Sequence, residues 1–139
     1  MQWDPPVFRP PFEFWRDGAV LHLSLREGAR LTAQVMKEMV RLVSALDRDG
    51  RSPVLIDHAP GVTIEDDARA LLVRVCRVQG HPVIVYSGSE QCRMQVEVFR
   101  QVHRPRFPLR VFASREEAWR WAQAFQQSEL ERSTQRGGS

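Results

Sequence analysis

A continuous apolar run near the middle of the chain stands out from the alternating patterns around it. Val54, Leu55 and Ile56 form this run, and Asp57 ends it. Such a run is typical of a central strand that is covered on both faces of a sheet, so we predict a strand over residues 53–57. Ligands and partners of open α/β sheets usually dock beyond the carboxyl ends of such strands. We therefore expect the functional surface in the segment that follows.

The segment after this strand carries the signals of a loop and of a helix start. Pro60 and Gly61 interrupt regular backbone structure. Thr63 then offers a hydroxyl to the free amides of a new helix, and Asp66 follows three residues on, which is a capping-box pattern. We predict a helix over about 64–79 with Thr63 as its cap.

Near the N-terminus, Asp17 and Gly18 separate two β-prone runs, which is a strong signal for a tight hairpin turn. Leucines alternate with polar residues in the second run, so we expect one buried face. The leucines are Leu21, Leu23 and Leu25, and the polar residues are His22 and Ser24.

Helical and strand periodicities alternate through the rest of the chain. The pattern predicts helices over 31–49, 90–103 and 115 to about 126, and strands over 83–86 and 109–112. Thr32 and Ser114 are the expected N-caps of the first and last of these helices. The resulting order, ββαβαβαβα, predicts one α/β domain with a mixed five-stranded sheet and about four helices.

Two of these helices carry large apolar side chains whose placement bears on docking. The helix over 90–103 has one apolar stripe, with Phe99 beside it. Its members are Met94, Val98 and Val102. In the last helix, Trp121 lies on the inward stripe and Trp119 lies off it. Trp119 is therefore the better candidate for an exposed contact.

The 139 residues suffice for one domain with a substantial core. We predict a proline-rich arm over 1–11, a domain over 12–126 and a disordered polar tail over 127–139. No apolar run approaches the roughly 20 residues of a membrane span, and the first residues lack a signal-peptide pattern. The two cysteines and four histidines lack metal-ligand spacing. These features predict a cytoplasmic protein without a metal or cofactor.

Positive charge is mild overall and concentrated in one stretch. The formal charge is +3 and the pI is about 9.5, which permits contact with nucleic acid without requiring it. The densest part contains Arg100, His103, Arg104, Arg106 and Arg110, with Phe107 between them. Clustered arginines can hold phosphates, so Arg100, Arg104 and Arg106 are candidate anion contacts. We favour the alternative of a solvated helix end, and we find no strong nucleic-acid signal.

Four landmarks and the order of the elements carry a family resemblance. The landmarks are Trp15–Ala19, Pro53–Asp57, Val83–Tyr86 and Val111–Trp119. From about Glu13 to Phe125 the chain resembles the STAS superfamily, the fold of bacterial anti-sigma-factor antagonists. It is most similar to the divergent STAS-like branch that is related to lipid-binding CRAL-TRIO domains. The likeness is a pattern of strands and caps and contains no catalytic signature.

In the antagonists, a serine in an Asp-Ser-Ser-Gly segment after the central strand is the switch that a kinase phosphorylates. The best match here, Glu65-Asp66-Asp67-Ala68, contains no serine. The resemblance implies that Asp66 or Asp67 stands in its place, with one negative charge against about 1.5 to 2 for phosphoserine. Acids also stabilise a helix start by about 0.3–1 kcal/mol each. We favour this simpler role, and both roles are compatible.

Candidate catalytic residues are few. Asp57 and His58 resemble an acid–base pair, but neighbouring residues in a strand point to different sides. No nucleophile with a recognisable motif accompanies them. An enzyme centred on Asp57, His58 and Cys92 ranks third among our hypotheses, and we expect Cys92 to be structural.

The leading hypothesis is a non-enzymatic, regulatory STAS-like domain that binds a protein partner. The contact residues would be Asp57, His58, Thr63, Glu65, Asp66 and Asp67. The alternative is a carrier of a lipid or small apolar molecule, as the CRAL-TRIO likeness suggests. Homodimerisation through the aromatic-rich ends or the edge of the hairpin stays open.

Overall fold

The structure is a computed structural model that describes residues 11–47, 52–77 and 80–125. The predicted arm over 1–11, apart from Pro11, and the predicted tail over 127–139 lie outside the described residues.

Five strands form the main sheet, in the order β1-β2-β4-β6-β7. They are β1 (Phe12–Asp17), β2 (Val20–Leu25), β4 (Val54–His58), β6 (Val83–Tyr86) and β7 (Leu109–Phe112). β1 runs antiparallel to β2, and the other neighbours are parallel. Gly18, at φ +62°, provides the positive φ that the tight hairpin turn needs. The predicted mixed five-stranded sheet is confirmed.

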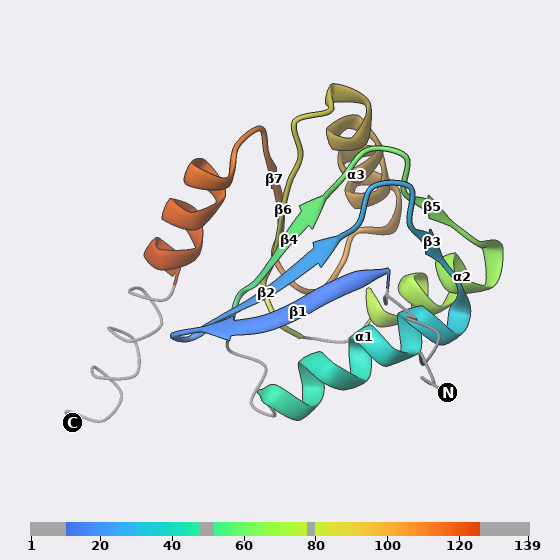
Figure 1. The fold of residues 1–139 in the computed structure, drawn as a ribbon, viewed down its shortest axis with the longest axis horizontal. Coiled ribbons are helices and arrows are strands. Elements are labelled where there is room, and N and C mark those ends of the chain that lie inside the picture. Colours follow the sequence, from blue (N-terminus) through green and yellow to red (C-terminus); the bar gives the residue numbers. More distant parts are fainter. Residues whose placement is uncertain (1–10, 48–51, 78–79, 126–139) are drawn as a thin grey trace, which may run out of the picture.

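Each parallel crossover contains a helix, and a further helix follows β7. The helices are α1 (Ala33–Leu46), α2 (Asp66–Val75), α3 (Glu90–His103) and a C-terminal helix over 115–125. Every crossover moves one strand in the same direction, so right-handed connections place α1, α2 and α3 on one face of the sheet. The C-terminal helix lies across the sheet from α1 and α2 (Figure 1). Within the described residues, one face is therefore covered by a single helix.

The core divides between the two faces of the sheet. The α1 and α2 face buries Leu21, Leu23, Leu25, Met36, Met39, Val54 and Ala68. The face of the C-terminal helix buries Val20, Leu55, Ile84, Ala118 and Ala122. β4 contributes Val54 to one cluster and Leu55 to the other, as its continuous apolar sequence predicts.

Two predicted N-caps are present with their hydrogen bonds. The Val35 backbone N–H donates to the Thr32 hydroxyl at 3.2 Å, and the Glu117 N–H donates to the Ser114 hydroxyl at 3.3 Å. These bonds satisfy free amides at the starts of α1 and the C-terminal helix.

The apolar stripe of α3 does not face the sheet. Met94, Val98 and Val102 are 61%, 52% and 66% exposed, whereas Cys92 is buried and Phe99 is half-buried. The helix thus packs on the sheet through a different side from the one that periodicity suggests. The stripe is an exposed apolar surface.

Both faces of β2 are covered. The leucine face is buried, as predicted, and on the other face His22 lies under the C-terminal helix. His22 is 2% exposed. Its ring stacks between Trp15 and Trp119, with centroid distances of 5.1 and 5.4 Å. The prediction of an exposed Trp119 is wrong, because the C-terminal helix places this side chain against His22.

His22 lacks a hydrogen-bond partner for Nε2 among the described residues. The nearest carboxylate oxygen, Asp17 Oδ2, is 3.9 Å away. Burial lowers the pKa of His22, and the charge of Arg115 lowers it further, while Asp17 opposes the shift. The stacked ring is thus held neutral between two tryptophans.

Acidification should loosen this packing. The pKa of His22 lies below its ordinary value of 6.5, so the unfolded chain takes up the proton more readily. The free energy of unfolding should fall as pH drops through 6.5 toward the lower, folded-state pKa, and level off below it. His22→Phe should flatten this dependence. Urea denaturation, followed by tryptophan fluorescence, measures it.

His103→Phe is the matched control, because His103 of α3 also lies beside an aromatic ring, that of Phe99, at 4.6 Å. This variant should keep the wild-type slope between about pH 7.5 and pH 5.5. An equal slope in His22→Phe and wild type would contradict the assignment to His22.

Candidate functional site

A second, small sheet holds the segment that follows the central strand. It pairs β3 (Arg30–Leu31) with β5 (Thr63–Ile64) in parallel. Three backbone hydrogen bonds flank or complete it: Gly28 N–H to Pro60 C=O at 3.1 Å, Thr63 N–H to Ala29 C=O at 2.9 Å, and Glu65 N–H to Leu31 C=O at 3.0 Å. The connection from β4 to α2 is therefore attached to the connection from β2 to α1.

This pairing corrects the predicted start of α2. Thr63 is an exposed residue of β5 and does not cap the helix. The N-cap is Glu65, which makes no side-chain cap hydrogen bond. The backbone of Thr63 is committed to the strand, so the helix begins at Asp66, two residues later than predicted.

Two glycines allow the close approach of these segments. Gly28 and Gly61 have φ values of +72° and +76°. A Cβ on Gly61 would lie 3.4 Å from the Gly28 nitrogen and 3.5 Å from its Cα. Backbone conformation and space both favour glycine at position 61.

Gly61→Ala should therefore destabilise the protein. A left-handed backbone costs an L-residue about 1–2 kcal/mol. Gly88→Ala is the matched control, because a Cβ there meets no atom within 4 Å and the φ is not positive. Chemical denaturation should show a loss of about 1–2 kcal/mol for Gly61→Ala and a change within about 0.5 kcal/mol for Gly88→Ala. Equal stability of the two variants would contradict this account of the loop.

Three acidic residues open α2, and we call Glu65, Asp66 and Asp67 the acidic turn. The Glu65 carboxylate pairs with Arg30 of β3 at 2.5 Å. Asp67 accepts a hydrogen bond from the Ala68 N–H at 3.1 Å. Asp66 and Asp67 are exposed, and no cationic side chain of the described part pairs with either. Two carboxylates without a cationic partner in the described part thus project from a segment that backbone bonds hold in place.

Asp57 and His58 leave β4 toward opposite faces. The Ser24 hydroxyl donates to the Asp57 carboxylate at 3.5 Å. Burial raises the pKa of the neighbouring Tyr86, and the charge of Asp57 raises it further. His58 Nδ1 lies 3.1 Å from the carbonyl oxygen of its neighbour Ala59. The two residues do not form an acid–base pair.

Cys92 is buried in the first turn of α3, where its N–H donates to the Ser89 hydroxyl at 3.3 Å. It belongs to the face opposite to the one that Asp57 faces. The structure therefore does not assemble the catalytic group of Asp57, His58 and Cys92.

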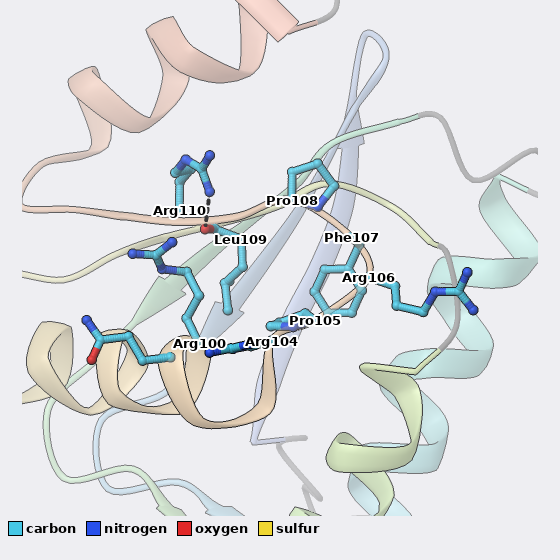
Figure 2. Close-up of a pocket in the computed structure, with 9 residues that line it drawn as sticks. Arg100, Arg104, Pro105, Arg106, Phe107, Pro108, Leu109 and Arg110 are labelled. Atoms are coloured by element: carbon cyan, nitrogen blue, oxygen red, sulfur yellow. Dashed lines mark hydrogen bonds between the residues drawn. The ribbon is translucent and has the colours of Figure 1, made fainter.

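The candidate anion contacts line a hollow beside β7 (Figure 2). Its volume is about 610 Å³, and its lining contains Arg100, Gln101, Arg104, Arg106, Phe107, Leu109 and Arg110, with Pro105 and Pro108. Four guanidinium groups come from the end of α3, the following turn and the strand.

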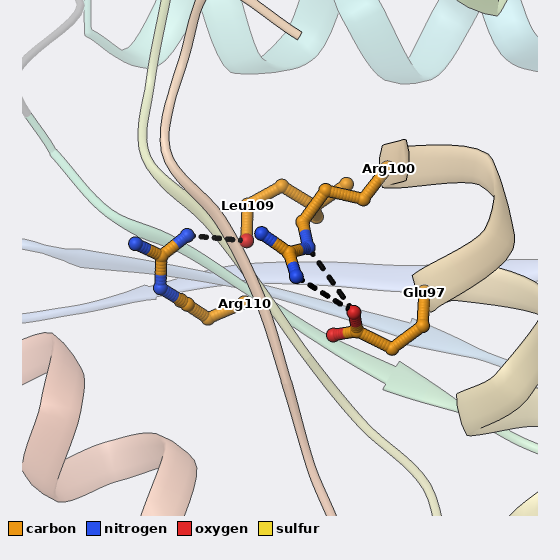
Figure 3. Close-up of polar contacts among 4 residues, drawn as sticks. All are labelled: Glu97, Arg100, Leu109 and Arg110. Atoms are coloured by element: carbon orange, nitrogen blue, oxygen red, sulfur yellow. Dashed lines mark hydrogen bonds and ion pairs between the residues drawn. The ribbon is translucent and has the colours of Figure 1, made fainter. Parts of the chain in front are cut away.

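These arginines do not all converge. Arg100 donates twice to the Glu97 carboxylate, at 2.8 and 3.2 Å (Figure 3). Arg106 extends away from Arg100 and Arg110 in Figure 2, and it donates to the Arg77 carbonyl at 3.4 Å. Arg104 ends α3 in the left-handed conformation, at φ 44°. Arg110, which the predicted anion contacts omit, also lines the hollow, but its guanidinium lies 5.9 Å from the centre of the Trp121 ring.

Two further features bear on function. Among residues 11–47, 52–77 and 80–125, no group of three or more His, Cys, Asp or Glu side chains could hold a metal ion. In the same ranges no helix has the length and apolar character needed to cross a membrane.

The comparisons with known proteins agree with the fold. The sequence profile of a family described as a domain of unknown function, DUF7793, matches residues 14–126. The chain belongs to the DUF7793 family. A search of curated proteins found no match to this DUF7793 chain.

Among solved structures, the chain is similar to an uncharacterised protein of the DUF3478 family from Shewanella loihica PV-4, described as having a SpoIIAA-like fold. The TM-score is 0.56 and the sequence identity is 15%, over 80% of this chain and 91% of that chain. At this identity the likeness establishes the fold, which is SpoIIAA-like, or STAS-like. The fold that the sequence resemblance implied is thereby confirmed.

Sequence reasoning missed the features that attach the connection after β4 to the one before α1. The strands β3 and β5 gave no signal, because two residues show no periodicity, and the Arg30–Glu65 pair depends on their pairing. Glycines on both connections, at Gly28 and Gly61, were the available hint.

Proposed function

We propose that this DUF7793 domain is a non-catalytic regulatory module that binds a basic surface of a protein partner through its acidic turn. Asp66 and Asp67 supply the charge, and Thr63, also exposed, borders them. Asp57 and His58 are half-buried on β4, so they position the loop and lie at the rim of the contact.

One observation carries the proposal. Asp66 and Asp67 are exposed and lack a cationic partner in the described part of the chain, while the backbone that presents them is bonded to β3. Fixed charges cost less entropy on binding than charges on a flexible loop, and they favour a basic partner. Glu65 forms an ion pair with Arg30, so it supports the acidic turn and is not available to the partner.

The other hypotheses receive less support. The three candidate catalytic residues lie apart. Asp57 and His58 leave β4 toward opposite faces and Cys92 is buried in α3, which does not favour catalysis. Four of the nine residues that line the hollow beside β7 are arginines, and a second hollow contains Glu90, Glu97 and Glu117 beside its apolar residues. Linings of this charge do not favour a lipid or an apolar cargo.

The test compares two pairs of helix-start acids. Asp66→Asn/Asp67→Asn removes the acidic turn's free charge, and Glu116→Gln/Glu117→Gln removes the same charge from the first turn of the C-terminal helix. Both should cost similar stability, about 0.3–1 kcal/mol per acid. Proteins captured by crosslinking in the source cell would be purified and their affinities measured by calorimetry and stopped-flow.

We expect a captured protein whose affinity falls about five- to tenfold with Asp66→Asn/Asp67→Asn, chiefly through slower association, and stays unchanged with Glu116→Gln/Glu117→Gln. The effect should weaken at high salt. If every purified partner binds the two double variants equally well, the acidic turn is not the contact surface.

A further inference from the structure

Among the strands that the structure describes, β7 is at the edge of the main sheet and has backbone groups that point out of the sheet. The Pro108 carbonyl accepts from Val83 N–H at 2.8 Å, and the Phe112 carbonyl accepts from Ser87 N–H at 3.1 Å. Because carbonyl directions alternate along a strand, the N–H and C=O groups of Leu109 and Val111 face away from β6. These groups form an open edge.

One outward group is covered by the neighbouring side chain. Arg110 Nη1 donates to the Leu109 carbonyl at 2.9 Å (Figure 3). No other group of the described chain bonds the outward N–H or C=O of Val111. A charged side chain that covers part of an edge is a common protection against unwanted strand pairing. The Arg110 side chain bonds the carbonyl of its own neighbour, so a backbone N–H of an added strand could replace it at the Leu109 carbonyl.

Arginines border this edge on both faces of the sheet, and on the α3 side Glu90 and Glu97 lie near it as well, with Glu97 paired to Arg100. Arg100 and Arg104 approach from the α3 side. Arg110 projects on the other side, where its guanidinium lies 5.9 Å from the centre of the Trp121 ring. An added strand would alternate its side chains between these two faces. Acidic side chains would therefore meet arginines on either face.

Apolar surface also flanks the edge. Met94 lines a hollow that includes Val111 and Phe112 of β7, and it begins the exposed stripe that continues through Val98 and Val102. A partner with apolar residues next to its acidic ones would cover this surface.

We propose that the β7 edge binds an extended acidic segment of another protein, which adds to the main sheet as a further strand. Charge complementarity selects this occupant over a second copy of the chain. Pairing two β7 edges would bring both Arg110 side chains and both neighbouring arginine groups close together, and facing like charges destabilise a strand pair. The proposal concerns a different element from the acidic turn and does not rest on it.

The probe is an octapeptide of alternating glutamate and valine, acetylated and amidated, titrated into the full chain at low and moderate salt. Two controls share its charge or its shape: the same peptide with alternate backbone nitrogens methylated, and a lysine–valine octapeptide. Val111→Pro removes an outward N–H without a bond to β6, a position where proline is tolerated in edge strands. Val111→Ala is its matched control, because it shortens the side chain and keeps the N–H.

The wild type and Val111→Ala should bind the glutamate–valine peptide at least about tenfold more tightly than Val111→Pro does. The methylated and the lysine peptides should bind at least about tenfold more weakly to the wild type. Hydrogen exchange of the Val111 amide should slow when the acidic peptide is bound. The methylated peptide tests the proposal even if Val111→Pro fails to fold.

Three outcomes would overturn the proposal. Equal binding of the methylated and unmethylated peptides would show attraction by charge without strand addition. Tighter binding of a ten-residue oligothymidylate, unaffected by Val111→Pro, would assign the arginines to nucleic acid. A dimer of the free protein in sedimentation that Val111→Pro abolishes would assign the edge to a second copy.

Discussion

The structure depends on how the chain leaves the central strand. β4 is paired with parallel strands on both sides and contributes to the core on both faces, so its position in the sheet is fixed. Beyond β4, the chain forms β5, which pairs with β3. α2 begins two residues after the end of β5. The start of α2 thereby acquires a fixed place relative to the sheet, and with it the two free carboxylates of Asp66 and Asp67.

A second constraint is the direction of winding. Each crossover advances the sheet by one strand in the same sense, which stacks α1, α2 and α3 on one face and leaves the other to the C-terminal helix. Trp119 of this helix contacts the sheet by stacking on His22, whose imidazole is buried. The same winding ends at β7, whose free edge lies among arginines. The two candidate surfaces thus arise from one topology and differ in charge.

Much of the fold was predictable from the sequence because long elements leave periodic signals. The run Val54–Ile56, the Asp17–Gly18 turn and the caps at Thr32 and Ser114 each act locally, and each appears where predicted. The side that α3 turns to the sheet and the burial of His22 depend on contacts between distant segments. For Thr63, local cap chemistry competed with a tertiary strand pairing, and the pairing determined the helix start.

The acidic turn is preformed on this structure, and native-state hydrogen exchange tests its preformed state most directly. The amides of Thr63 and Glu65, which donate to Ala29 and Leu31, should be protected nearly as well as those of β4, whereas the Asp66 amide, in the free first turn of α2, should exchange fast. Exchange of Thr63 and Glu65 at the rate of an unstructured loop would contradict the account.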